Sequence, residues 1–304
     1  MLGLFFSCTI EHGETRKPNI LFILIDDLGK EWISFHGAEL VKTPHIDELA
    51  RTGMVFENAY SMPQCTPSRI TLLTGQYPWR NGWVNHYDVP RLGHGGRFDP
   101  EMNPSFAKNL RDAGYATCIA GKWQINDFRL EPDATVLAGF DEYCMWTGGE
   151  NGGTSTKASQ LRYWDPYIHT KEGSKTYEGQ FGPDIYTDFI IDFMRNNKEK
   201  PMMIYFPMCL SHGPLTTTPA EPDAPKEEQH QAMVRYTDLL LGKLVDALDE
   251  LEIRDNTIII WTTDNGTAVN QIGIRDGRYV RGGKARLTEN GINAPFIVNC
   301  PGTV

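Results

Sequence analysis

Short apolar runs alternate along the chain with longer segments whose apolar residues have helical spacing. The run over residues 19–25 (NILFILI) is continuous, as is typical of a strand buried on both faces. Residues 202–207 and 257–262 have the same character. Residues 231–251 place their apolar side chains on one stripe, which predicts an amphipathic helix. This alternation predicts an α/β fold, with a largely parallel mixed sheet sandwiched by helices on both faces.

Weaker patterns extend this order of elements. Further strands are predicted over residues 55–60, 115–120 and 295–298. Further helices are predicted from Pro44 to a stop at Gly53, from Pro104 to Gly114, and over residues 183–195. Residues 79–100 and 141–180 break the rhythm. Because strand patterns resume after each of them, we expect long surface loops there and not linkers between domains.

Charge and hydropathy exclude some classes of protein. The formal net charge is −10, and there is no run of Lys or Arg of the kind that a nucleic-acid-binding surface needs. No apolar stretch is long enough to span a membrane. We interpret residues 1–16 as a leader, with MLGLFFSC as the remnant of a secretory or lipoprotein signal. That interpretation predicts an exported protein that is periplasmic, lipid-anchored or secreted.

Polar clusters follow five of the predicted strands. In an open α/β sheet, ligands bind beyond the carboxyl ends of the strands. The clusters are Asp26-Asp27, residues 64–69, residues 121–123, Ser211-His212 and residues 264–266. Each one alone has an ordinary explanation, such as a turn or a surface charge. Five at one edge of a sheet indicate a functional site.

Four residues of these clusters offer hard oxygen ligands. They are Asp26, Asp27, Asp264 and Asn265. Three carboxylates brought together would repel one another, and a divalent cation removes that repulsion. Carboxylate and amide oxygens suit Ca²⁺ or Mg²⁺ and not zinc. The residues therefore predict a site for Ca²⁺ or Mg²⁺.

Cys65 lies in a polar turn that leads into a predicted helix. Pro67 is placed to be the first helical residue, residues 68–74 continue the helix, and Gly75 ends it. Cys65 would then lie at the helix N-terminus, which favours an anion or an anionic nucleophile. Arg69, one turn further on, can direct its planar guanidinium to the same place. A catalytic thiol with a depressed pKa is an open alternative.

The stretch CTPSR at 65–69, followed by LTG at 73–75, resembles the signature of the sulfatase family, Cys-x-Pro-x-Arg with a downstream Thr-Gly. Other blocks along residues 17–302 also resemble the family; they are residues 17–27, 43–47, 121–123, 212–214, 264–266 and 283–295. The resemblance implies an alkaline-phosphatase-like fold, with residues 17–304 as the N-terminal catalytic domain. It also implies a sulfuric ester hydrolase that acts on an aryl or carbohydrate sulfate.

The resemblance also implies roles for individual residues. A formylglycine-generating enzyme would oxidise Cys65 to formylglycine, whose hydrate attacks sulfur. The resemblance implies Ca²⁺ as the cation, with Mg²⁺ as the alternative, and its implied ligands are Asp26, Asp27, Asp264, Asn265 and the formylglycine at Cys65. The implied sulfate-binding and catalytic residues are Arg69, Lys122, Lys284 and His212, with His212 helping the alcohol to leave.

Three features depart from the family pattern. Gln124 stands where the family usually has His. A Gln side chain can hydrogen-bond a sulfate oxygen or the formylglycine, but it cannot act as a general base. Asn293 stands where the family usually has Arg. The chain ends at Val304, where sulfatases usually continue, so we expect that a smaller C-terminal subdomain is missing.

Two other functions remain open. Some relatives with a similar Cys motif hydrolyse phosphodiesters or phosphonate monoesters, and sulfate and phosphate are nearly isosteric. The chain could instead be an inactive, truncated domain that binds an anion, as Gln124 suggests. The two long loops contain Trp79, Trp83, Trp146 and Trp164. Aromatic rings suit sugars or aryl groups as well as ordinary packing, and we favour a carbohydrate sulfate.

Overall fold

A computed structural model describes residues 16–84, 99–126, 128, 131–146 and 161–303. Apart from its last residue, the predicted leader 1–16 lies outside these ranges. The same is true of residues 85–98 and 147–160, in the two segments predicted as loops. In the described ranges, no helix combines the length and the apolar character needed to cross a membrane.

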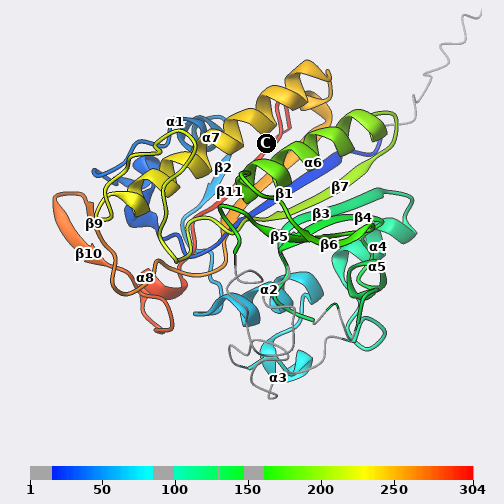
Figure 1. The fold of residues 1–304 in the computed structure, drawn as a ribbon, viewed down its shortest axis with the longest axis horizontal. Coiled ribbons are helices and arrows are strands. Elements are labelled where there is room, and N and C mark those ends of the chain that lie inside the picture. The colour runs from blue at the N-terminus through cyan, green and yellow to red at the C-terminus, as the bar shows by residue number, and fades with distance from the viewer. Residues whose placement is uncertain (1–15, 85–98, 127, 129–130, 147–160, 304) are drawn as a thin grey trace, which may run out of the picture.

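Nine strands form one mixed sheet in the order β2-β11-β8-β1-β7-β3-β4-β5-β6 (Figure 1). Strands β8, β1, β7, β3 and β4 are parallel neighbours, and β11, β5 and β6 pair antiparallel. The bounds are β1 Asn19–Ile25, β2 Met54–Phe56, β3 Ala116–Lys122, β4 Glu142–Trp146, β5 Tyr167–Thr170, β6 Gly173–Thr176, β7 Met202–Pro207, β8 Thr257–Thr263 and β11 Phe296–Asn299. Strands β9 (Ile272–Arg275) and β10 (Arg278–Arg281) form a separate hairpin.

Helices cover both faces of the sheet (Figure 1). On one face lie α1 (Pro44–Arg51), α6 (Gly182–Asn197) and α7 (Gln229–Glu250). On the other face lie α2 (Cys65–Thr74), α4 (Phe106–Asp112) and α5 (Ala134–Leu137). Short helices α3 (Pro78–Asn81) and α8 (Glu289–Ile292) follow α2 and the hairpin, respectively. The predicted α/β sandwich with a largely parallel mixed sheet is therefore confirmed.

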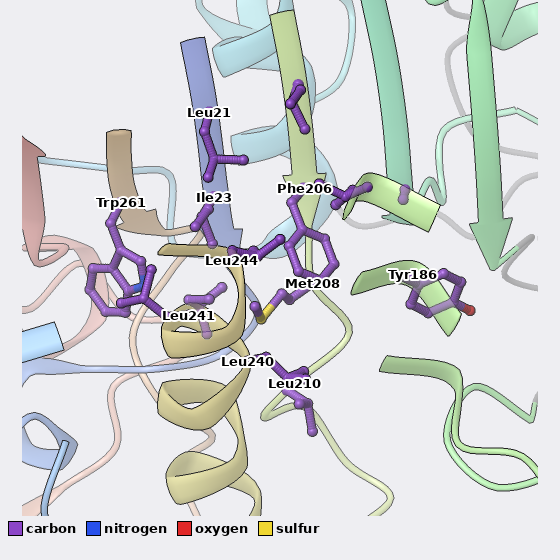
Figure 2. Packing of buried hydrophobic residues seen from close by; sticks show 14 of the residues in the cluster. Leu21, Ile23, Tyr186, Phe206, Met208, Leu210, Leu240, Leu241, Leu244 and Trp261 are labelled. Carbon is purple, nitrogen blue, oxygen red and sulfur yellow. The ribbon is translucent and has the colours of Figure 1, made fainter. Parts of the chain in front are cut away.

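The central strand β1 is buried because it supplies side chains to both cores. Ile23 packs with Leu244 of α7 and with Trp261 of β8 on one face (Figure 2). On the opposite face, Phe22 packs in the same cluster as Ile70 of α2. A strand with two buried faces needs apolar residues at successive positions, which accounts for the unbroken apolar run.

Some predicted boundaries are wrong. The strand predicted over residues 55–60 is only Met54–Phe56, because the polar residues that follow leave the sheet. The segment predicted as a loop over residues 141–180 contains β4, β5 and β6. Strand β6 is mostly exposed and polar, and it therefore lacks a hydrophobic pattern. Helix α2 begins at Cys65 and not at Pro67, because proline is compatible with the first turn of a helix.

Gly121 allows β3 to pass close to β7 just before Lys122. Its φ is +120°, and a Cβ at this position would lie 2.2 Å from the carbonyl oxygen of Pro207. Both the left-handed backbone and the close contact exclude a side chain. The glycine therefore fixes the end of β3, from which Lys122 extends.

We expect Gly121→Ala to lower the free energy of unfolding by about 2–5 kcal/mol, since strained backbone and overpacking act together. Gly114→Ala is the matched control, because Gly114 also has positive φ but a Cβ there would meet no atom within 4 Å. The free energy of unfolding of Gly114→Ala should fall by only about 1–2 kcal/mol. Urea unfolding would measure both, and equal losses would contradict the proposed close approach of β3 to β7.

Candidate active site

Four neighbouring parallel strands bring the predicted site residues to one edge of the sheet. Strand β1 runs into Asp26 and Asp27, and β8 runs into Asp264. Strand β3 ends at Lys122, and His212 follows β7 after a short turn. These strands are adjacent in the order β8-β1-β7-β3, so their carboxyl ends meet.

Two buried carboxylates at this edge are paired with buried cations. Lys122 Nζ donates to Asp26 Oδ2 over 2.6 Å. The guanidinium of Arg69 donates through Nη2 and Nε to Asp264 Oδ2, over 2.7 and 3.1 Å. Nη2 of Arg69 also lies 3.7 Å from Asp26 Oδ1. All four side chains are at most 2% exposed, so each charge depends on its partner for compensation.

Asp27 is the centre of a second group. Lys284 Nζ lies 2.6 Å from both of its carboxylate oxygens. Asn265 Nδ2 donates to Asp27 Oδ1 over 2.7 Å, and His212 Nε2 lies 3.6 Å from Oδ2. The backbone N–H of Asp27 donates to Asp264 Oδ1 over 3.1 Å, which joins this group to the first. Asp27 also has a φ of +59°, a conformation uncommon for a non-glycine residue.

The two deepest carboxylates have opposite pKa shifts. Burial opposes ionisation of Asp26, but the charge of Lys122, with those of other nearby basic groups, holds its pKa well below the ordinary value. Burial raises the pKa of Asp264 well above the ordinary value, the neighbouring Asp26 raises it further, and Arg69 only partly opposes this. Additional positive charge at this place would therefore favour the ionised form of Asp264.

The donor set fits a divalent cation. Asp26 Oδ1 and Asn265 Oδ1 are buried and accept no hydrogen bond from the described residues. Ligand atoms of Asp26, Asp27 and His212 lie within 4.8 Å of one another. Buried oxygens without partners are costly in free energy, and a bound cation removes that cost. Oxygens dominate this set, together with those of Asp264, which suits Ca²⁺ or Mg²⁺.

Cys65 is the first residue of α2 and is completely buried. Its Sγ donates to Gln124 Oε1 over 3.5 Å. Gln124 follows β3 and has a φ of +58°, so its backbone conformation is also unusual at this edge. The amide can donate or accept a hydrogen bond beside position 65, but it cannot take up a proton at neutral pH.

The ring of His212 has a defined orientation. Nδ1 lies 2.6 Å from the carbonyl oxygen of Gly213, and because a carbonyl only accepts, Nδ1 carries the hydrogen. Nε2 then faces the carboxylates. Burial lowers the pKa of His212 to about 4, with Lys122 contributing in the same direction against the effect of Asp26. The ring is therefore neutral near pH 7, with an acceptor directed at Asp27.

Arg162 lies beside the site, on the outer side of His212, although no sequence signal marked it. Its guanidinium carbon lies 3.9 Å from the centroid of the Trp146 ring, and Nη1 lies 3.4 Å from His212 Nδ1. Trp146 is only 2% exposed and ends β4 directly beside Lys122. Arg162 precedes the short strand β5 in a segment without hydrophobic periodicity, so its place depends on tertiary contacts.

The chain is similar to known proteins over most of its length. The family model described as Sulfatase matches residues 18–304. The human N-acetylgalactosamine-6-sulfatase is 31% identical, over 96% of this chain and 58% of that protein. The N-acetylgalactosamine-6-O-sulfatase of Bacteroides thetaiotaomicron is 29% identical, over 95% of this chain and 69% of that protein. The chain thus spans less than two thirds of the human relative.

Solved structures are similar over the same region. The crystal structure of Ps i-CgsB superposes with a TM-score of 0.79 at 26% identity, covering 95% of this chain and 67% of that one. The phosphonate monoester hydrolase of Agrobacterium radiobacter has the same fold, with a TM-score of 0.59 at 17% identity. The alkaline-phosphatase-like arrangement predicted from the sequence is confirmed by these structures.

We expect Ca²⁺ to stabilise the folded protein, by about 2.7 kcal/mol at a concentration 100 times its Kd. Asn265→Ala should abolish this effect, because it removes an unpartnered oxygen from the site. Asn256→Ala is the control, since Asn256 lies in the Arg254–Asn256 turn and bonds to the backbone of Lys17. Thermal unfolding with Ca²⁺, Mg²⁺ or chelator would measure the shift. An unchanged shift in Asn265→Ala would place the ion elsewhere.

Proposed function

Because the chain belongs to the sulfatase family, we propose that it hydrolyses a sulfate monoester carried by a carbohydrate. One observation supports this most directly: Cys65, in the CTPSR stretch, lies at the edge where three carboxylates and three cations converge. A formylglycine made from Cys65 would supply a hydrated aldehyde as the nucleophile. Asp26, Asp27, Asp264 and Asn265 would hold a divalent cation that supplies Lewis-acid stabilisation.

The charge balance of the site favours an anionic substrate. The carboxylates of Asp26, Asp27 and Asp264 are matched one for one by Arg69, Lys122 and Lys284. A divalent cation would leave the cluster positive. Arg69 and Lys122 are buried, so little water screens their charges. Fixed positive groups of this kind stabilise the charge that develops on sulfate oxygens during ester cleavage.

His212 is the residue best placed to exchange a proton with the substrate. Gly213 fixes the hydrogen on Nδ1, so Nε2 is the nitrogen that faces the reacting centre. In the free site Nε2 carries no proton, because burial lowers the pKa of His212 to about 4. A bound sulfate would place negative charge beside the ring and favour protonation of Nε2, from which the proton could pass to the departing alcohol oxygen. Gln124 cannot share this role, but its amide can hydrogen-bond a sulfate oxygen or the group at position 65.

The relatives suggest where the search for a substrate should begin. Two of them, from a human and a bacterial source, are named as sulfatases of N-acetylgalactosamine carrying a 6-sulfate. We propose a 6-sulfated amino sugar as the first substrate class to test. An aryl sulfate and a phosphodiester should be included, because relative turnover separates sulfate from phosphate specificity on one scaffold.

We expect Cys65→Ala to lower kcat on the sulfated sugar by at least about a thousandfold while the fold is retained. The parent protein should first be produced with a formylglycine-generating enzyme, and conversion at Cys65 confirmed by peptide mass spectrometry. Cys300→Ala is the matched control, since Cys300 is buried directly after β11, at the sheet edge opposite the site, and its Sγ donates to the backbone carbonyl of Asp255 over 3.9 Å. Circular dichroism would verify folding of both variants.

Near-parental turnover by Cys65→Ala would exclude the formylglycine mechanism. Complete conversion without turnover of any sulfate or phosphate ester would instead support an anion-binding domain. A preference for the phosphodiester would change the assigned reaction but leave the site assignment intact.

A further inference from the structure

Arg162 lies beside the site, on the outer side of His212, and has no acidic partner among the described residues. Arg69, Lys122 and Lys284 each contact a carboxylate within 2.7 Å. No carboxylate of the described residues lies within 4 Å of the Arg162 guanidinium, whose polar neighbour is His212 at 3.4 Å. Nε of Arg162 is buried and has no hydrogen-bond partner in the described part of the chain. A buried donor without a partner is costly, so a ligand is its natural complement.

Arg162 lies on the outer side of His212. The imidazole directs Nε2 towards Asp27 and Nδ1 towards the guanidinium, so the ring stands between Arg162 and the carboxylate cluster. A sulfate bound at the cluster would meet Arg69, Lys122 and Lys284 first. Arg162 would instead meet the part of the substrate that lies beyond the scissile oxygen.

The guanidinium is held in place before any ligand arrives. It stacks on the buried ring of Trp146 at 3.9 Å, and the neighbouring Tyr163 donates from its hydroxyl to the carbonyls of Cys209 and His212. Stacking leaves the edge of a planar guanidinium free to donate in parallel to two oxygens. Such an edge is well matched to a carboxylate or a sulfate.

Orientation of His212 is a weaker explanation for this arginine. Nδ1 already donates to Gly213 over 2.6 Å, which leaves no acceptor there for an N–H of Arg162. The contact at 3.4 Å therefore joins two donors and contributes no hydrogen bond. Arg162 is therefore better suited to bind a ligand than to orient the imidazole of His212.

We propose that Arg162 binds a second anionic group of the substrate, located next to the sulfate ester that is cleaved. This inference rests on the proposed sulfatase function and narrows its substrate class to sugars with two anionic groups. The second anion has two chemical sources: another sulfate on the same ring, or the carboxylate of an adjoining uronic acid.

The test compares three substrates that share one scissile 6-sulfate. They are N-acetylgalactosamine 6-sulfate, its 4,6-disulfate, and a disaccharide in which the 6-sulfated sugar adjoins a uronate. The variants are Arg162→Met, which keeps the apolar stem, and Arg162→Lys, which keeps the charge without the fork. Arg278→Met, on the exposed strand β10, is the matched control.

Arg162→Met should lower kcat/KM about 10- to 100-fold, mainly through KM, on whichever substrate supplies the second anion. The monosulfate should change by less than about threefold, because it makes no contact with Arg162. Arg162→Lys should fall between the parent and Arg162→Met. The disulfate and the uronate disaccharide distinguish the two sources of the anion.

Equal losses on all three substrates would overturn the proposal and assign Arg162 a structural role. Unchanged kinetics on all three would overturn it as well. If the converted parent hydrolyses no sulfate ester, the proposed function fails independently of Arg162. In that case calorimetric titration still tests whether Arg162 binds the second anion. The disulfate and the disaccharide would be titrated into the Cys65→Ala protein and into the Cys65→Ala, Arg162→Met double variant. Weaker binding to the double variant supports the proposal, and equal affinity contradicts it.

Discussion

Compensation of buried charge is the constraint on which this structure depends. Asp26, Asp27 and Asp264 are nearly inaccessible to water, and removing a single counter-ion would leave a buried charge unpaired. The counter-ions come from three segments: Arg69 from α2, Lys122 from β3 and Lys284 from the loop after the β9–β10 hairpin. The packing of these elements around the sheet is therefore inseparable from the electrostatics of the site.

The parallel sheet explains why such a costly cluster can exist at all. Adjacent parallel strands end at the same edge, so short polar stretches far apart in sequence become neighbours without a long loop. The backbone at this edge of the sheet is also strained. Asp27 and Gln124 have positive φ directly after two of these strands, and the surrounding structure must hold both in place. Strain of this kind is concentrated at functional sites.

The sequence predicted those parts in which a local pattern carries the information. Residues 19–25, 202–207 and 257–262 were readable as strands, because two buried faces leave an unbroken apolar run. The CTPSR stretch and the polar strand ends identified the residues that the structure brings together. Strands β5 and β6 were not predictable, because a short, partly exposed edge has no hydrophobic period. Arg162 was missed because only tertiary contact with Trp146 and His212 gives it meaning.

The paired charges of the site are far apart in the sequence, and this separation has a consequence for how the chain folds. Asp26 and Asp27 directly follow the first strand, whereas Lys284 comes 257 residues after Asp27 in the sequence. Strand β1 pairs with β7 and β8, so during synthesis from the N-terminus both of its neighbours in the sheet emerge before Lys284 does. Until Lys284 is in place, the Asp27 carboxylate lacks its counter-ion. The charge of Asp27 is therefore compensated only after the segment that contains Lys284 has packed against the end of β1.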